Sequence, residues 1–188
     1  MKIYRIIAVT FLGILMHAFA EECELMPPAD NLDLDKYFSL QPVYVTHSRE
    51  GPQETVCREY KTTKISEDTS NTLVISDYKK GGTTHHSELK CTNKLKNGIK
   101  GQFNVECELP ERTNGPKIQV ETSVIYTDNK NYALLQTCTK TGSGIKDDIL
   151  VLQTKKNGVD EGVKAVFKKL NWELEKWNPR EKVDCNNI

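Results

Sequence analysis

The sequence predicts an all-β domain of eight antiparallel strands followed by one C-terminal helix, and three observations support this prediction. Between about residues 43 and 155, short β-type segments alternate with turn residues, which is typical of a meander that forms a sandwich or an up-and-down barrel. Beyond this region the apolar residues follow the period of an α-helix. Six cysteines in a chain of 188 residues indicate a domain held together by disulfides.

The first 20 residues are interpreted as a secretory signal peptide. Lys2 and Arg5 flank an apolar run over residues 6–16, and the sequence "HAFA" ends at Ala20, after which cleavage is expected. No later segment approaches the roughly 20 apolar residues that a spanning helix needs. We therefore expect a secreted protein without membrane insertion, in which residues 21–188 form a single domain.

The charge balance argues against a nucleic-acid partner. The chain has 26 basic and 26 acidic side chains, and loss of Lys2 and Arg5 with the signal segment leaves 24 basic ones, a net charge of −2. Nucleic acids and anionic membranes are bound through strongly basic patches or tails. Neither is expected to be a partner of this protein.

Eight segments have the composition of short strands, separated by turn sequences such as Asn97-Gly98 and Asn114-Gly115-Pro116. They are "VYVTHS" (43–48), "TVCREYKTTK" (55–64), "NTLVISDYK" (71–79), "TTHHSELKC" (83–91), "KGQFNVECEL" (100–109), "KIQVETSVIY" (117–126), "YALLQTCTK" (132–140) and "DILVLQTKK" (148–156).

One amphipathic helix is predicted over residues 159–177. Asp160 lies near its expected start and Pro179 beyond its expected end. Its apolar residues form a single stripe made of Val163, Val166, Phe167, Leu170 and Leu174.

All six cysteines follow the expected cleavage site. They are Cys23, Cys57, Cys91, Cys107, Cys138 and Cys185. An even number of cysteines in a secreted chain favours structural disulfides, and the absence of CxxC spacing argues against metal binding or redox catalysis by these thiols.

His85 and His86 are adjacent and point to opposite faces of a strand, so no metal site is expected there. The chain also lacks a serine nucleophile elbow, a phosphate-binding glycine loop and an HExxH motif, so we do not expect an enzyme.

Several stretches resemble the salivary lipocalins of blood-feeding triatomine bugs. They are "DKYFSLQPVYVTHS", "VCREY", "YALLQTC", "DILVLQTKK" and the leader junction "AFAEECELMPPADN". Within this triabin-like group the chain most resembles the pallidipin and triplatin branch, whose members inhibit platelet aggregation. The resemblance implies an eight-stranded up-and-down lipocalin barrel with its C-terminal helix packed outside.

The resemblance also implies three bridges, Cys23 with Cys138, Cys57 with Cys185, and Cys91 with Cys107. The last pair agrees with a hairpin centred on Asn97-Gly98. Two departures from relatives matter. The third strand segment contains no histidine to serve as an axial iron ligand, so no haem cofactor is expected, and the usual glycine-x-tryptophan motif of lipocalins is replaced by "LQPVY".

Strand alternation then assigns candidate ligand-binding residues. If Cys57 faces outward to reach Cys185, Arg58 and Tyr60 face into the barrel. With Cys138 outward, Leu135 and Thr137 face inward, whereas Leu134 and Gln136 face outward, and we expect replacement of Gln136 to change nothing. On the last strand both faces are apolar, and the register implied by the family places Ile149, Val151 and Gln153 inside.

Arg58 is the central candidate because a guanidinium inside a barrel needs an acid or an anionic ligand. It could lie in solvent at the mouth of the barrel or pair with a structural carboxylate. The functional alternative is that Arg58 binds the carboxylate of a fatty-acid-derived ligand while Tyr60 and Gln153 hydrogen-bond its oxygenated part.

Two classes of function follow. In the first, the protein, expected to be a monomer, sequesters a small lipid mediator, an eicosanoid such as thromboxane A2, and so inhibits platelet aggregation; a biogenic amine is a variant of this idea but would require inward acids. In the second, loops or the outer wall bind host haemostatic proteins such as a coagulation or contact-system protein or a platelet receptor.

Overall fold

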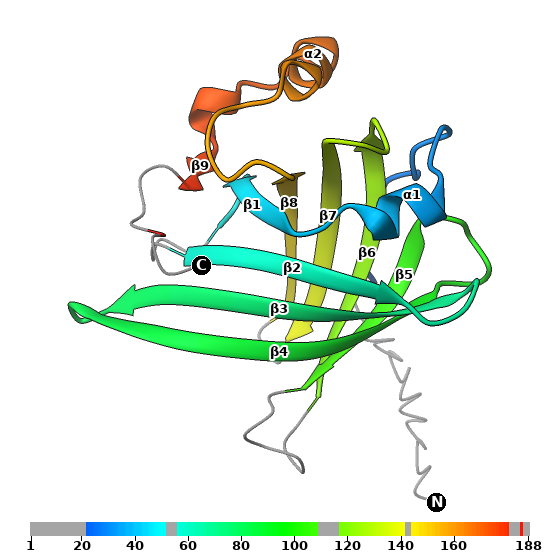
Figure 1. Ribbon diagram of the computed structural model, residues 1–188, viewed down its shortest axis with the longest axis horizontal. Helices are drawn as coiled ribbons and strands as arrows, with labels where there is room; N and C mark the ends of the chain where they lie inside the picture. The colour runs from blue at the N-terminus through cyan, green and yellow to red at the C-terminus, as the bar shows by residue number, and fades with distance from the viewer. Residues whose placement is uncertain (1–21, 52–55, 109–116, 142–143, 181–184, 186–188) are drawn as a thin grey trace, which may run out of the picture.

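The computed structural model describes residues 22–51, 56–108, 117–141, 144–180 and 185. The expected signal peptide, residues 1–20, lies outside these residues. Figure 1 shows a barrel of long strands with a helix at its outer side. The elements are α1 (Leu34–Ser39), β1 (Val43–Ser48), β2 (Val56–Lys64), β3 (Thr69–Lys80), β4 (Thr83–Leu95), β5 (Gln102–Glu108), β6 (Ile118–Thr127), β7 (Tyr132–Thr141), β8 (Gly144–Gln153), α2 (Glu161–Leu170), the 3₁₀-helix η1 (Leu174–Lys176) and β9 (Asn178–Pro179).

The sheet is closed because β1 pairs with both β2 and β8. The strand order runs from β2 consecutively to β8, continues with β1, and returns to β2 through the pairs Val43–Tyr60 and Tyr44–Glu59. Every pairing between neighbouring strands is antiparallel. The prediction of an eight-stranded up-and-down barrel is therefore confirmed, and the sandwich is excluded. The short β9, which the sequence did not predict, is added beside β1.

Helix α2 packs on the outside of the barrel, as predicted, but it is shorter than the predicted segment 159–177. The Asp160 side chain caps its first turn, and Asn171 ends it in the left-handed conformation with φ of 53°. The chain then continues into η1. The buried helix side chains join outward residues of β6, β7 and β8 in an outer cluster: Ile125, Tyr132, Leu134, Ile149, Val151, Val163, Val166, Phe167 and Trp177. In the part of the chain that the structure describes, no helix is long and apolar enough to span a membrane.

The sequence did not predict α1, a six-residue helix that lies across one end of the barrel. Asp33 caps it by accepting from two backbone amides of its first turn. Phe38 of α1 packs edge-on against Phe103 of β5, with 5.7 Å between ring centroids. On the rim of the same end, Lys64 at the end of β2 forms an ion pair with Asp35. This end of the barrel is therefore covered, and β2 begins at the opposite end.

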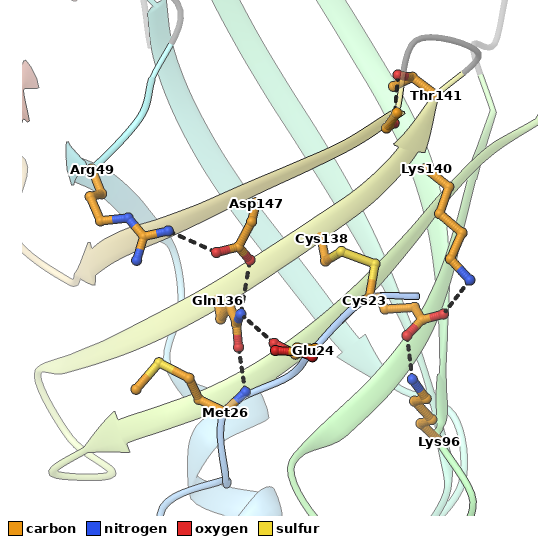
Figure 2. Close-up of a disulfide and its surroundings, with 12 residues drawn as sticks. Cys23, Glu24, Met26, Arg49, Lys96, Gln136, Cys138, Lys140, Thr141 and Asp147 are labelled. Carbon is orange, nitrogen blue, oxygen red and sulfur yellow. Dashed lines mark hydrogen bonds and ion pairs between the residues drawn. A yellow bond between two sulfur atoms is a disulfide. The ribbon is translucent and has the colours of Figure 1, made fainter. Parts of the chain in front are cut away.

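An N-terminal strap (residues 22–33) crosses the outside of β6 and β7, and Gln136 fixes it there (Figure 2). The Gln136 amide accepts from Met26 N (2.6 Å) and donates to Glu24 O (3.0 Å) and to an Asp147 carboxylate oxygen (2.8 Å). Gln136 faces outward as predicted, but the expectation that its replacement would change nothing is not supported, because it is 3% exposed and connects three segments.

All three predicted disulfides are present, but only two of them lie on the outer wall. Cys23 is bonded to Cys138, and Cys57 to Cys185. The Cys91–Cys107 bridge instead joins directly opposed residues of β4 and β5 and borders the barrel interior. A bridged cysteine therefore does not mark the outer face in every case: Cys57 and Cys138 do so, but Cys91 and Cys107 do not, because two neighbouring strands can be bridged on either face of a sheet.

Candidate ligand-binding cavity

The barrel encloses a cavity of about 450 Å³, bordered by side chains of α1 and all eight barrel strands. This volume lies in the range of about 300–1,000 Å³ that is typical of small-molecule sites. Its walls are largely aliphatic and aromatic: Phe38 and Phe103 lie at the end covered by α1, and Val74, Leu89 and Leu135 line the sides. Hydroxyl groups of serine, threonine and tyrosine are distributed among them.

Arg58 is half-buried and borders this cavity, as strand alternation predicted. It is the only charged residue among the described residues that line the cavity, which include no aspartate, glutamate, lysine or histidine. Directly opposite it on β3 is Ser76, and Ser87 lies opposite Ser76 on β4. Because Arg58 is the third residue of β2, it lies towards the end of the barrel away from α1.

The C-terminal segment contacts the outer face of β2 next to Arg58. Arg180 donates from outside to the Arg58 carbonyl oxygen at 3.2 Å, and the neighbouring Cys57 is bonded to Cys185. With Cys57 buried on the outer face, the pleat directs the next side chain inward. The C-terminal segment thus fixes the strand whose inner face carries the cation.

Among the described residues, no structural acid neutralises Arg58. Within the described ranges, no hydrogen bond or ion pair joins its guanidinium to another residue. Glu59 points to the outer face, where it pairs with Lys61 at 3.0 Å. Asp148 has the inward alternation of β8 but is absent from the cavity lining, and its oxygens accept from Ser48 Oγ (2.6 Å) and Glu50 N (2.8 Å). Of the alternatives for Arg58, pairing with a structural carboxylate is therefore not observed.

Tyr60, Leu135 and Thr137 also line the cavity, so the predicted orientation of these side chains is confirmed, and their contact with a ligand remains a prediction. Tyr60 lies opposite Val43 on β1 and Val74 on β3, so its phenol belongs to an otherwise apolar row of side chains.

The predicted inward orientation of Val151, Gln153 and Ile149 is wrong. In the β7–β8 ladder, residues directly opposite each other share a face, and outward Cys138 and Leu134 are opposite Asp147 and Val151. The odd-numbered residues of β8 therefore face outward, and Leu150 and Leu152 line the cavity in their place. Alternation could not reveal this from the strand alone, because α2 makes the outer face of β8 as apolar as the inner one.

Gln153 and Val151 consequently have structural roles outside the cavity. The Gln153 amide donates to Thr46 Oγ1 (2.7 Å) and Gly158 O (3.1 Å), and accepts from Asp160 N (2.6 Å). It therefore fixes the connection that leads into α2. Val151 is fully buried in the outer cluster, beneath the same helix.

Val151→Ala is expected to lower the free energy of unfolding by about 1.5–2.5 kcal/mol, because it removes two buried methyl groups and leaves a cavity under α2. Ligand affinity should not change. Val74→Ala is the matched control, since Val74 borders the cavity, and it should weaken ligand binding at a smaller cost in stability. Urea denaturation and calorimetric titration of both variants test this, and weaker binding by Val151→Ala alone would contradict the observed register.

Sequence reasoning missed Tyr37, which α1 projects into the lining of the cavity. Its ring lies 5.4 Å from that of Phe38. Burial raises the pKa of the Tyr37 phenol well above its usual value, and the nearby Tyr60 adds to this rise. The capping residue Asp33 was the available sequence signal for α1, but six residues are too few for an apolar period to emerge.

A separate polar cluster of the lining satisfies its own hydrogen bonds. Thr62 and Thr72 share a hydrogen bond of 2.9 Å between their hydroxyls. The Asn93 amide donates to Thr72 Oγ1 (2.9 Å) and Ser70 Oγ (3.0 Å). In the described ranges no group of three or more histidine, cysteine or acidic side chains could hold a metal ion.

Comparison with known proteins identifies relatives over nearly the whole chain. The Triabin family model matches residues 20–166. Pallidipin from Meccus pallidipennis is 69% identical over 97% of this chain and 98% of its own length. Platelet inhibitor triplatin-2 from Triatoma infestans is 45% identical over 96% of this chain and 98% of its own.

Two solved structures share the fold at low sequence identity. The complex of LTBP1 with leukotriene C4 has a TM-score of 0.60 and 23% identity, covering 81% of this chain and 88% of that one. The amine-binding protein of Rhodnius prolixus, in complex with tryptamine, has a TM-score of 0.69 and 15% identity, covering 86% and 87%. At these identities the likeness establishes the fold alone.

Proposed function

We propose that this chain, which belongs to the Triabin family, is a secreted inhibitor of platelet aggregation. Within the family it belongs to the pallidipin and triplatin branch of triatomine salivary lipocalins. Proteins of this family bind ligands and are not enzymes. The chain acts by sequestering an anionic, fatty-acid-derived mediator inside the barrel, an eicosanoid such as thromboxane A2. Three disulfides and the expected signal peptide support secretion, and membership of a family of salivary lipocalins points to saliva as the destination. The relative named platelet inhibitor triplatin-2 supports the target process.

The observation that carries this proposal is the isolated cation of the cavity. Arg58 is the only charge among the lining residues that the structure describes, and none of the described acids pairs with it. Removing a guanidinium from water without compensation is costly, and a ligand carboxylate would compensate it through a charge-assisted, potentially bidentate contact. A biogenic amine would instead need a carboxylate in the lining, and the described lining contains none.

The distribution of the other side chains supports an amphipathic ligand. Arg58 lies towards the uncovered end of the barrel, whereas Phe38 and Phe103 lie at the end that α1 covers. A lipid with its carboxylate at Arg58 would extend its hydrocarbon part along Leu89 and Leu135 towards these rings, where burial of apolar surface supplies affinity. The leukotriene complex of LTBP1 is a case of an eicosanoid bound by a protein of this fold.

Isothermal titration with three compounds tests the proposal: a stable thromboxane mimic with a free carboxylate, its methyl ester, and tryptamine. The free acid should bind with 1:1 stoichiometry, the ester at least tenfold more weakly because it loses the charged hydrogen bond, and tryptamine not measurably. In platelet suspensions, aggregation by a thromboxane mimic should be inhibited in proportion to added protein, and aggregation by a thromboxane-independent agonist should be little affected. Equal binding of acid and ester would remove the role of charge. Strong inhibition without binding of either compound would favour recognition of a host protein by the loops.

A further inference from the structure

Two phenols converge in the cavity from different elements. Tyr37 comes from α1 and Tyr60 from β2, and both line the cavity. They are close enough for Tyr60 to contribute to the raised pKa of the Tyr37 phenol. Tyr37 therefore remains protonated and able to donate a hydrogen bond throughout the physiological pH range.

Neither phenol has a hydrogen-bond partner within the described part of the chain. The contrast with Thr62, Thr72 and Asn93 is informative, because those polar groups of the same lining satisfy one another. A hydroxyl that loses water without gaining a partner costs about 1–3 kcal/mol, whereas a phenylalanine would fill the same apolar surroundings at no such cost. Among the described residues no fully buried side-chain oxygen or nitrogen lacks a partner, so water reaches these two hydroxyls in the ligand-free cavity. A ligand that fills the cavity displaces this water and must offer an acceptor in its place.

The position of the pair relative to Arg58 limits what that acceptor can be. Arg58 and Tyr60 are two residues apart on one face of β2, a spacing of roughly 7 Å along the strand. Tyr37 is carried by α1, at the covered end of the barrel. A ligand whose carboxylate contacts Arg58 would thus present a different, uncharged oxygen to the two phenols.

We infer that Tyr37 and Tyr60 together recognise an uncharged oxygen on the chain of the ligand, so that the cavity selects oxygenated fatty acids over unoxygenated ones of equal length. This inference rests on the proposed function and adds the selectivity of the same site. The wall and Arg58 treat both lipids alike, and discrimination comes from two hydroxyls that an unoxygenated chain would leave without a partner.

The test is a calorimetric comparison of the stable thromboxane mimic with arachidonate, using Tyr37→Phe, Tyr60→Phe and the double variant. The wild-type protein should bind the mimic more tightly than arachidonate. Each single variant should weaken binding of the mimic about threefold to tenfold, as expected for one neutral hydrogen bond. Binding of arachidonate should become tighter, because the variant no longer leaves that hydroxyl without a partner when the unoxygenated chain displaces water. In the double variant the preference for the mimic should largely disappear.

Tyr126→Phe is the matched control, because Tyr126 packs with the outer cluster and Lys169 lies over its ring at 5.6 Å. It should alter neither affinity. The inference would be overturned if the wild-type protein bound the two lipids equally, or if the phenylalanine variants bound both as the wild type does. Either result would leave the proposed function intact and would indicate that water is the partner of the phenols. Failure of the wild-type protein to bind either lipid would overturn the proposed function and the inference together.

Discussion

Arg58→Ala is expected to weaken binding of an anionic lipid about tenfold to a hundredfold, which corresponds to about 1.5–3 kcal/mol for a hydrogen bond to a charged group. The guanidinium is the only charge of the described lining, so no other described side chain of the cavity can replace it. Arg58→Lys should restore only part of the affinity, because an ammonium does not reproduce the planar pair of donors. Isothermal titration with the stable thromboxane mimic measures both changes.

The same substitution should not destabilise the ligand-free protein. Arg58 has no acidic partner within the described residues, so its removal breaks no ion pair and relieves an uncompensated, half-buried charge. The free energy of unfolding should stay equal or rise, whereas removal of a residue that only supports the fold would lower it. Urea denaturation of wild type and Arg58→Ala without ligand distinguishes these cases.

Lys90→Ala is the matched charge control. Lys90 is exposed and lies next to inward Cys91 on β4, so it removes one positive charge from the outside of the barrel. It should leave lipid affinity unchanged at physiological salt. If Arg58→Ala retained both lipid affinity and platelet inhibition, sequestration would be contradicted, and binding of a host protein would be the better account.

Strand alternation predicted the cavity residues wherever one residue of known orientation lay on the same strand. Cys57 fixed the faces of β2, and Cys138 fixed those of β7, so Arg58, Tyr60 and Leu135 were placed inside correctly. Both cysteines are held by partners outside the sheet, which leaves only one possible face for each of them.

The β8 strand shows why the same method failed elsewhere. A helix covering the outer wall makes both faces apolar, so Val151 and Leu152 cannot be told apart by composition. The information lay in the neighbouring strand, because pairing Cys138 with Asp147 sets the face of every residue in β8. Cross-strand register depends on the geometry of the turn between the strands, which strand alternation alone does not provide.

The remaining omissions concern segments whose structure comes from tertiary contacts. Helix α1 has six residues and is held by packing of Phe38 on Phe103 and by the cap at Asp33, neither of which produces a sequence period. The central role of Gln136 was likewise not apparent, because its partners Glu24 and Met26 are more than 100 residues away. The fold and the family could therefore be predicted from the sequence, whereas the position of Tyr37 in the cavity could not.

The second large effect is expected on stability, from removal of the Cys23–Cys138 bridge. Replacing both cysteines by alanine should lower the free energy of unfolding by about 5 kcal/mol, because the bridge spans 115 residues and its loss greatly enlarges the unfolded ensemble. The thiol positions face outward, so the lipid affinity of the protein that remains folded should be nearly unchanged. Guanidinium denaturation, with non-reducing peptide mapping to verify the other two bridges, measures this change.

The Cys91–Cys107 bridge provides the comparison, because its sequence separation is only 16 residues. Its removal should cost less, about 3 kcal/mol on the same loop-length argument, but should also perturb ligand binding, since it borders the cavity. Gln136 also holds the N-terminal strap, through its hydrogen bonds to Met26 N and Glu24 O (Figure 2), so we expect the strap to stay in place when Cys23 and Cys138 are replaced. Equal stability losses for the two bridge variants, with no change in lipid affinity for either, would show that loop length and cavity contact do not govern their contributions.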